Sequence, residues 1–172
     1  MFDRAVINTA IRYGVTGGIV SVVYILLLAF SGFENPYDNA SEYSSTFIFV
    51  SVFIFLGIKY FKKFYDAELG FAKAFKVGLL ISFFLAFTAA MLLCIYSVFA
   101  GQEMIKEYII LSQNRMEITR QELVKVMGEL NYKNVYQNLN HLDGFKLAQI
   151  SFVNRMVAGF FISIVLGVFF RK

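Results

Sequence analysis

Four long stretches of this chain contain no charged residue and no histidine, and the charged residues lie between them. The stretches are 13–33, 43–58, 77–102 and 156–170. A helix needs about 20 apolar residues to cross a bilayer core of about 30 Å. Only 16% of the residues are charged and 58% are hydrophobic, which is unusual for a soluble domain. We therefore expect an all-α polytopic membrane protein, a single domain built as a bundle of four transmembrane helices.

The four spans are expected at about 11–33, 43–61, 74–101 and 150–170. The second and fourth charge-free stretches are short, so their spans take in flanking residues that include Lys59 and Arg155. Long basic side chains near a helix end can extend toward the lipid headgroups. Strands of a membrane barrel would alternate apolar and polar residues, and these stretches are apolar on all sides. The sequence therefore predicts helices.

The distribution of basic residues predicts the orientation, because Lys and Arg are enriched in short cytoplasmic loops. Basic residues precede the first span, follow the fourth and fill the segment 59–76, whereas the loop between the first two spans has none. We expect both termini and the 59–76 loop to be cytoplasmic. The five lysines of this loop are Lys59, Lys62, Lys63, Lys73 and Lys76.

The segment 103–149 is long and nearly neutral, which is compatible with an extracytoplasmic position. Residues 119–122 match a helix capping box, and the apolar residues that follow have helical spacing. Residues 138–144 predict a break before the fourth span. Two amphipathic helices are expected here, packed on each other and on the outer leaflet or docked on a partner. The first apolar face comprises Leu123, Val126, Met127 and Leu130.

Small residues recur at three- and four-residue spacing in the spans, which is typical of close helix packing in membranes. They would either close the bundle within one chain or leave one stripe for a homo-oligomer or a partner's helix. The positions expected to pack are Gly14 and Gly18 in the first span, Gly78 and Ser82 in the third, and Gly159, Ser163 and Gly167 in the fourth.

The residue types that support membrane chemistry are scarce in this sequence. Proton relays and ion-coupled carriers use ionisable groups at membrane depth, and none is expected near a span centre. Cys94 is the only cysteine and His141 the only histidine, so neither a metal site nor a disulfide is expected. We expect no enzyme activity, no cofactor and no metal.

The basic loop has two open interpretations. It is either a topology signal or a contact surface for anionic lipid or for an acidic patch of a partner protein. Its five lysines and Arg155 are the candidate contact residues. Nucleic acid is not expected as a partner, because the basic segment is short and lies against the membrane.

The same loop carries a family resemblance. The sequence 57–60, Gly-Ile-Lys-Tyr, and the sequence 71–79, Phe-Ala-Lys-Ala-Phe-Lys-Val-Gly-Leu, resemble paired motifs of the DUF4199 family of four-span Bacteroidota membrane proteins. Ala72 stands where the family usually has Gly, and the proline that commonly enters the last span is missing. The resemblance extends over nearly the whole chain. It implies a multi-pass protein of the bacterial inner membrane, in a family without an established activity.

Two functions follow as expectations. The first is a non-catalytic accessory or assembly subunit of a membrane complex, which acts through contacts with membrane lipids and with a membrane-protein partner or a second copy of itself. The alternative is binding or translocation of an anionic lipid. The resemblance implies that this lipid could be a polyprenyl phosphate, handled alongside a lipid-linked sugar transferase.

Overall fold

The computed structural model describes residues 3–171, and this part of the chain is helical with short connections and no β-strand. Eight α-helices and one π-helix follow one another along it. They are α1 Arg4–Phe30, α2 Asn39–Ser45, η1 Thr46–Val50, α3 Ser51–Phe64, α4 Phe71–Phe99, α5 Gln102–Ile118, α6 Arg120–Met127, α7 Glu129–Leu139 and α8 Gly144–Phe170.

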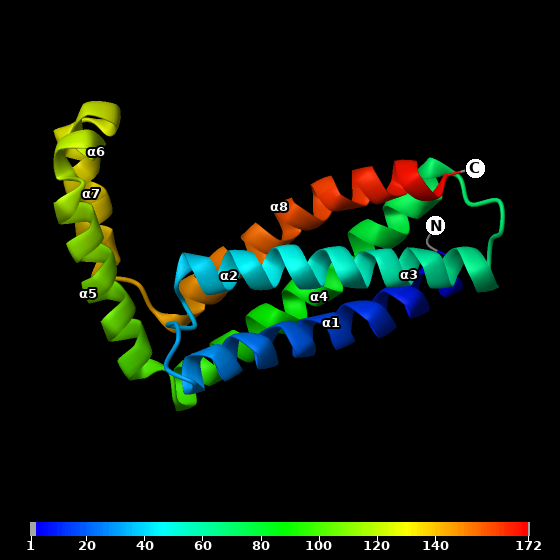
Figure 1. Ribbon diagram of the computed structural model, residues 1–172, viewed down its shortest axis with the longest axis horizontal. Helices are drawn as coiled ribbons and strands as arrows, with labels where there is room; N and C mark the ends of the chain where they lie inside the picture. The colour runs from blue at the N-terminus through cyan, green and yellow to red at the C-terminus, as the bar shows by residue number, and fades with distance from the viewer. Residues whose placement is uncertain (1–2, 172) are drawn as a thin grey trace.

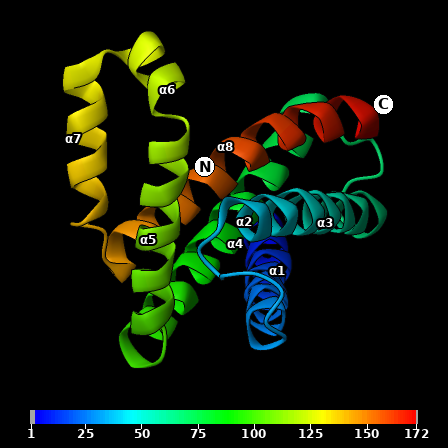
Figure 2. The same cartoon turned by 60° about the vertical axis from the view of Figure 1, so that its left-hand side comes forward.

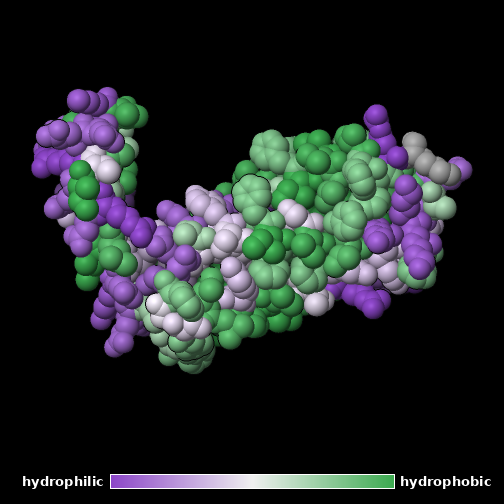
Figure 3. Space-filling view, viewed as in Figure 1, coloured by the Kyte–Doolittle hydropathy of each residue, from purple (hydrophilic) through white to green (hydrophobic). Residues whose placement is uncertain are grey.

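Four helical segments of the described chain are long and apolar enough to cross a membrane. They are α1, the continuous helix formed by α2, η1 and α3, then α4 and α8, with 27, 26, 29 and 27 residues. At about 1.5 Å per residue, each exceeds the thickness of a bilayer core. Figure 3 shows the apolar band over these helices and polar surface at both ends. The predicted all-α, four-span fold is confirmed.

The helix α4 lies at the centre of the bundle, with α1 on one side and α8 on the other (Figures 1 and 2). α1 runs parallel to α4, and α8 runs antiparallel to it. α3 covers the groove that these helices leave and contacts all three. Both ends of the described chain lie beside the turn between α3 and α4, and we call this the basic end of the bundle.

The segment predicted as a basic loop is mostly helical. α3 continues to Phe64 and α4 begins at Phe71, so the connection is only the short turn 65–70. Helix is maintained because lysines at a span end can keep their charges in water while their stems pack on the helix. The turn is anchored by Leu69, which is fully buried.

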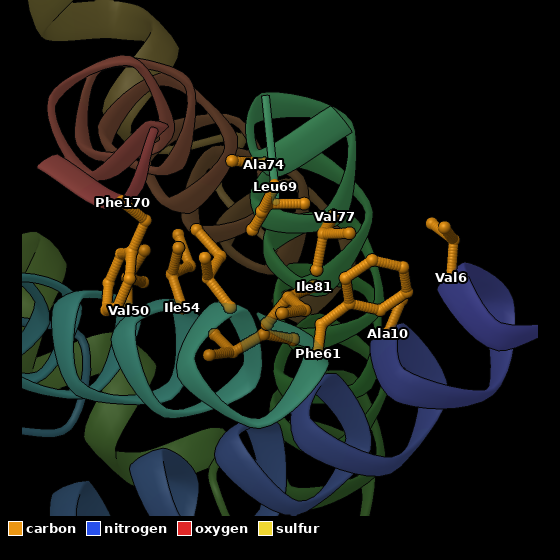
Figure 4. Close-up of a cluster of buried hydrophobic side chains, with 12 residues drawn as sticks. Val6, Ala10, Val50, Ile54, Phe61, Leu69, Ala74, Val77, Ile81 and Phe170 are labelled. Carbon is orange, nitrogen blue, oxygen red and sulfur yellow. The ribbon is translucent and has the colours of Figure 1, made fainter. Parts of the chain in front are cut away.

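The largest apolar cluster of the described residues lies in the half of the bundle next to the basic end (Figure 4). α1, η1, α3, α4 and the last turn of α8 all contribute to it. Its members include Val6, Ile54, Phe61, Ile81 and Phe170. All four spans are therefore fixed to one another at this end.

At the opposite end, α5, α6 and α7 form a helical hairpin set across the bundle (Figures 1 and 2). The break predicted at 138–144 is found, since α7 ends at Leu139 and α8 begins at Gly144. The capping-box prediction is wrong in its chemistry: Thr119 precedes α6 but makes no side-chain cap. Its hydroxyl donates to the carbonyl of Arg115, 2.9 Å away, in the preceding helix.

Candidate functional site

The most unusual polar group in the described chain is Arg155, whose side chain is 0% exposed. Its Nη1 lies 2.8 Å from Oε1 of Glu42, and it also donates to the hydroxyl of Ser151. Its Nη2 lies 3.5 Å from the hydroxyl of Ser45. An arginine taken out of water needs a carboxylate and further acceptors to offset the loss of hydration. The site supplies both from α2 and α8.

This geometry corrects the expectation for Arg155, which was predicted to reach lipid headgroups or a partner. Side chains of a helix lean toward its N-terminus, and the N-terminus of α8 lies at the hairpin end. The guanidinium is therefore directed into the bundle toward α2, where Glu42 is nearly buried as well. A side chain with no exposed surface cannot contact lipid.

The depth of Arg155 follows from the register between α4 and α8. Gly159 of α8 packs directly on Ser82 of α4, and Ser163 packs on Gly78. Arg155 lies one turn before Gly159, so its backbone is level with Ala86, near the middle of α4 (Phe71–Phe99). The prediction that no ionisable residue lies near a span centre was therefore wrong for Arg155.

The π-helix η1 begins directly after Ser45 and separates the polar start of this span from its apolar remainder. π-helical turns inside longer helices are rare and are frequently found at functional sites. Ser45 also donates to the backbone carbonyl of Ser21 in α1, 3.3 Å away. The polar contacts of Arg155 thus extend from α8 through α2 to α1.

Two unpaired polar atoms and a small cavity adjoin the ion pair. Nε of Arg155 and the hydroxyl of Thr46 are buried without a hydrogen-bond partner. A cavity of about 40 Å³ lies on the hairpin side, lined in part by Asn39, Glu42, Ser151 and Asn154. Its volume suits a molecule the size of water. The ion pair thus borders a small, partly polar cavity on its hairpin side.

The hairpin is fixed to the bundle by a second ion pair. Arg115 of α5 donates two hydrogen bonds to the carboxylate of Asp38, at 2.9 and 2.8 Å. These bonds lower the pKa of Asp38 and raise the pKa of Arg115. Asn35 adds a bond of 2.8 Å to the carbonyl of Met104. α5 is thus held by a backbone contact at its start and by an ion pair in its last turn.

An apolar cluster beneath the hairpin adds to this attachment. Ile105 of α5 packs with Tyr37 of the first connection and Leu147 of α8. Burial raises the pKa of the Tyr37 hydroxyl. The hairpin's base is therefore a packed part of the fold, and its distal end is free of the bundle (Figure 1).

The five predicted lysines lie at the basic end, but they do not act alike. Lys62 donates to the carbonyl of Phe170 at 2.8 Å, and Lys73 pairs with Asp66 at 2.9 Å. Lys59, Lys63 and Lys76 are exposed. The sequence therefore predicted that the five lysines lie at one end of the bundle. The structure adds that two of them make contacts within the chain and that three are exposed.

The seven predicted packing residues all face another helix of the same chain. Gly14 lies against the backbone of α4, where an added Cβ would come within 2.6 Å of Phe84 and 2.8 Å of the Ile81 carbonyl oxygen. The remaining contacts join α1 to α4 and α4 to α8. They pair Gly18 with Thr88, Gly78 with Ser163, Ser82 with Gly159, and Gly167 with the ring of Phe71.

Sequence reasoning missed Glu42, Asp38, Arg115 and Ser151 as site residues. A usable signal existed, since Glu42 and Arg155 are opposite charges at the hairpin-side ends of two predicted spans. Nothing in the spacing along the chain indicated that these two residues meet, because 113 positions separate them.

The fold and these contacts define a multi-pass membrane protein with four helical spans and a helical hairpin at one end. A family model described as "Protein of unknown function (DUF4199)" matches residues 12–172, and the chain belongs to this family. The resemblance noted in the sequence is thereby confirmed. No curated protein and no solved structure matches the chain.

The chemistry at Arg155 is that of a fixed structural contact. Arginine stays protonated in proteins, and Glu42 neutralises its charge at 2.8 Å. In residues 3–171, no group of three or more His, Cys, Asp or Glu residues is arranged to hold a metal ion. The arrangement can pin helices together and connect the hairpin to the bundle.

Proposed function

We propose that this protein is a non-catalytic accessory or assembly subunit of a complex in the bacterial inner membrane. The hairpin α5–α7 is the surface that binds the partner. The observation that carries this proposal is its distal end, where Ile118, Val126 and Leu130 are 84%, 85% and 80% exposed. Large apolar side chains exposed together are typical of interaction sites.

The rigidity of the hairpin's base supports a presenting role. The Arg115–Asp38 pair and the Ile105 cluster fix α5 to the bundle, so the distal end is held at a set position. A preorganised surface loses less conformational entropy on binding than a mobile one. The buried Arg155–Glu42 pair fits the same role, because it stabilises the helix from which the hairpin is held.

The basic end supports the proposed orientation. Arg4, Arg12, the five lysines and Arg171 all lie at this end of the bundle, where Figure 3 shows hydrophilic surface. Following the positive-inside rule, we place this end and both termini in the cytoplasm. The hairpin then lies on the extracytoplasmic side, where it would meet a periplasmic or membrane-embedded partner.

Site-specific photo-crosslinking in cells tests this function. We expect a photoreactive residue at Val126 or Leu130 to capture one defined protein, which also co-purifies in mild detergent. Asn134, an exposed polar residue of α7, is the matched control position and should give little product. Capture of lipid alone at both apolar positions would contradict the proposal.

The lipid-handling alternative is separated by the same purification. A stoichiometric protein partner favours the accessory role, and a retained polyprenyl phosphate in place of any protein favours lipid handling. The structural observation behind the alternative is an apolar groove beside Lys59, between α3 and α8.

A further inference from the structure

The helix α8 borders two apolar grooves that open on the membrane-facing surface. One, of about 510 Å³, lies between α3 and α8, and the other, of about 550 Å³, lies between α4 and α8. The α3–α8 groove is lined by Ser51, Val52, Phe55, Leu56, Phe161, Ile162, Val165 and Leu166. Grooves of this size accommodate one hydrocarbon chain of a lipid.

The α3–α8 groove lies in the half of the bundle next to the basic end. Both helices run from the hairpin end to the basic end (Figure 1). The ring of Phe55, which lines the groove, packs on the ring of Phe170, with centroids 5.2 Å apart. Phe170 is the last residue of α8. The groove therefore leads toward the headgroup level at the basic end.

Positive charge marks that end of the groove. Lys59 lies one turn beyond Phe55 on α3, is exposed, and holds its ammonium 5.8 Å from the centroid of the Phe55 ring. One turn further along α3, Lys62 contacts the carbonyl of Phe170. The exposed Arg171 is the next residue after Phe170 in the chain. A lipid phosphate at this level would meet two or three cationic groups.

The α4–α8 groove provides an internal comparison. Its lining is Phe87, Ala90, Met91, Cys94, Phe145, Ala148, Gln149, Phe152 and Val153, with no charged side chain among these residues. Its volume is similar, but it lies in the hairpin half of the bundle, where Lys146 lines an adjoining groove that shares Gln149 and Val153 with it. The α4–α8 groove is thus a comparison of similar size at the other end of the bundle.

We propose that the α3–α8 groove is a binding site for one anionic phospholipid of the leaflet at the basic end. One acyl chain lies along Phe55, Phe161 and Val165, and the phosphate lies beside Lys59. A lipid is the occupant because the groove is continuous with the lipid-facing surface of the spans. Its anionic headgroup follows from the cations at the groove's end.

The chain has no tryptophan, so one introduced tryptophan reports on the lipid beside it. Phe161→Trp places this reporter in the α3–α8 groove, and Phe145→Trp places it in the α4–α8 groove. Both phenylalanines are 61% exposed, which makes the two sites matched. Each protein is reconstituted in phosphatidylcholine vesicles that contain either brominated phosphatidylglycerol or brominated phosphatidylcholine as the quenching lipid.

We expect brominated phosphatidylglycerol to quench Phe161→Trp at about fivefold lower mole fraction than brominated phosphatidylcholine, since one lysine contributes about that factor. Adding Lys59→Gln should abolish the preference. Lys76→Gln, which removes an exposed lysine of α4 at the same end, should leave it unchanged. In Phe145→Trp, Lys59→Gln should leave the quenching by both lipids unchanged.

Two results would overturn the site. Equal quenching of Phe161→Trp by both lipids would show that the groove does not select charge. The lipid preference could also survive Lys59→Gln, or Lys76→Gln could reduce it by the same amount. Either result would show that the preference comes from the overall charge of the basic end and not from the groove. Circular dichroism and elution volume confirm that each variant is folded before it is compared.

Discussion

Asp38 caps the N-terminus of α2, Glu42 lies one turn into that helix, and each of them binds an arginine from a different part of the chain. The backbone N–H of Glu42 donates to the carbonyl of Asp38 at 3.0 Å. Asp38 binds Arg115 of the hairpin, and Glu42 binds Arg155 of α8. The short helix α2 thereby links the hairpin to the interior of the bundle.

Removing the buried arginine should strongly destabilise the fold. Arg155→Leu leaves Glu42 without its partner, and breaking a buried pair in this way costs about 3–5 kcal/mol. The double variant Arg155→Leu/Glu42→Leu should recover part of this loss. The free energy of unfolding of the single and double variants is measured in mixed detergent micelles. If the double variant were destabilised by as much as the two single variants added together, the coupling between Arg155 and Glu42 would be contradicted.

An exposed ion pair of the hairpin serves as the control for this series. Arg120 and Glu129 lie 3.3 Å apart with more than half of each side chain exposed. Pairs of this kind contribute up to about 1 kcal/mol. Arg120→Leu should therefore change the unfolding free energy much less than Arg155→Leu.

Acidification should weaken the contact between the last turn of α5 and the start of α2. The pKa of Asp38 lies below its ordinary value of 3.8 because Arg115 hydrogen-bonds the carboxylate. The contribution of this pair to stability is complete above about pH 3.8 and is lost as the pH falls through the lowered pKa. Limited proteolysis of the hairpin in nanodiscs should therefore accelerate at low pH. In Asp38→Asn it should already be fast at pH 7, with a weaker pH dependence.

Substitution of Gly159 should separate α8 from α4. The α-carbon of Gly159 lies directly against Ser82, so Gly159→Leu forces the two helices apart and should cost about 1–3 kcal/mol or more. The control is Gly70→Ala, because Gly70 has open space around it and an ordinary backbone φ of −79°. Sedimentation in detergent should show the same oligomeric state for both proteins, since this packing lies within one chain.

Cysteine labelling tests the orientation. In a Cys94→Ala background, Asn134→Cys on the hairpin should react with an impermeant maleimide in intact cells whose outer membrane has been permeabilised. Lys63→Cys at the basic end should react only after the inner membrane is opened. If Lys63→Cys were labelled from outside, the proposed orientation would be wrong, and the hairpin would lie on the cytoplasmic side.

The spans could be predicted from sequence because their signal is local. Long charge-free stretches and the cost of exposing backbone polar groups to lipid leave few alternatives to helices. The small-residue stripes were equally visible, since Gly14 and Gly18 stand four residues apart. Which helix each stripe meets depends on the order of the helices in the bundle, and spacing along the chain carries no such information.

The buried ion pair could not be predicted for a related reason. Arg155 near one end of an expected span is an ordinary sign of a membrane boundary. α8 begins at Gly144, six residues before the predicted start at 150, so Arg155 lies nearer the centre of the span than expected, and there it faces Glu42 of α2. An error of less than two turns at a helix boundary thus changed an interfacial residue into an interior one.

The π-helical segment Thr46–Val50 sets the angle between the two halves of the second span. One residue inserted into or deleted from a helix rotates everything before it by about 100° relative to everything after it. The second span therefore consists of two halves with independent rotational settings, one that presents Glu42 to α8 and one that presents Ile54 to the apolar core. A one-residue change in the length of this segment would therefore rotate Glu42 by about 100° relative to Ile54.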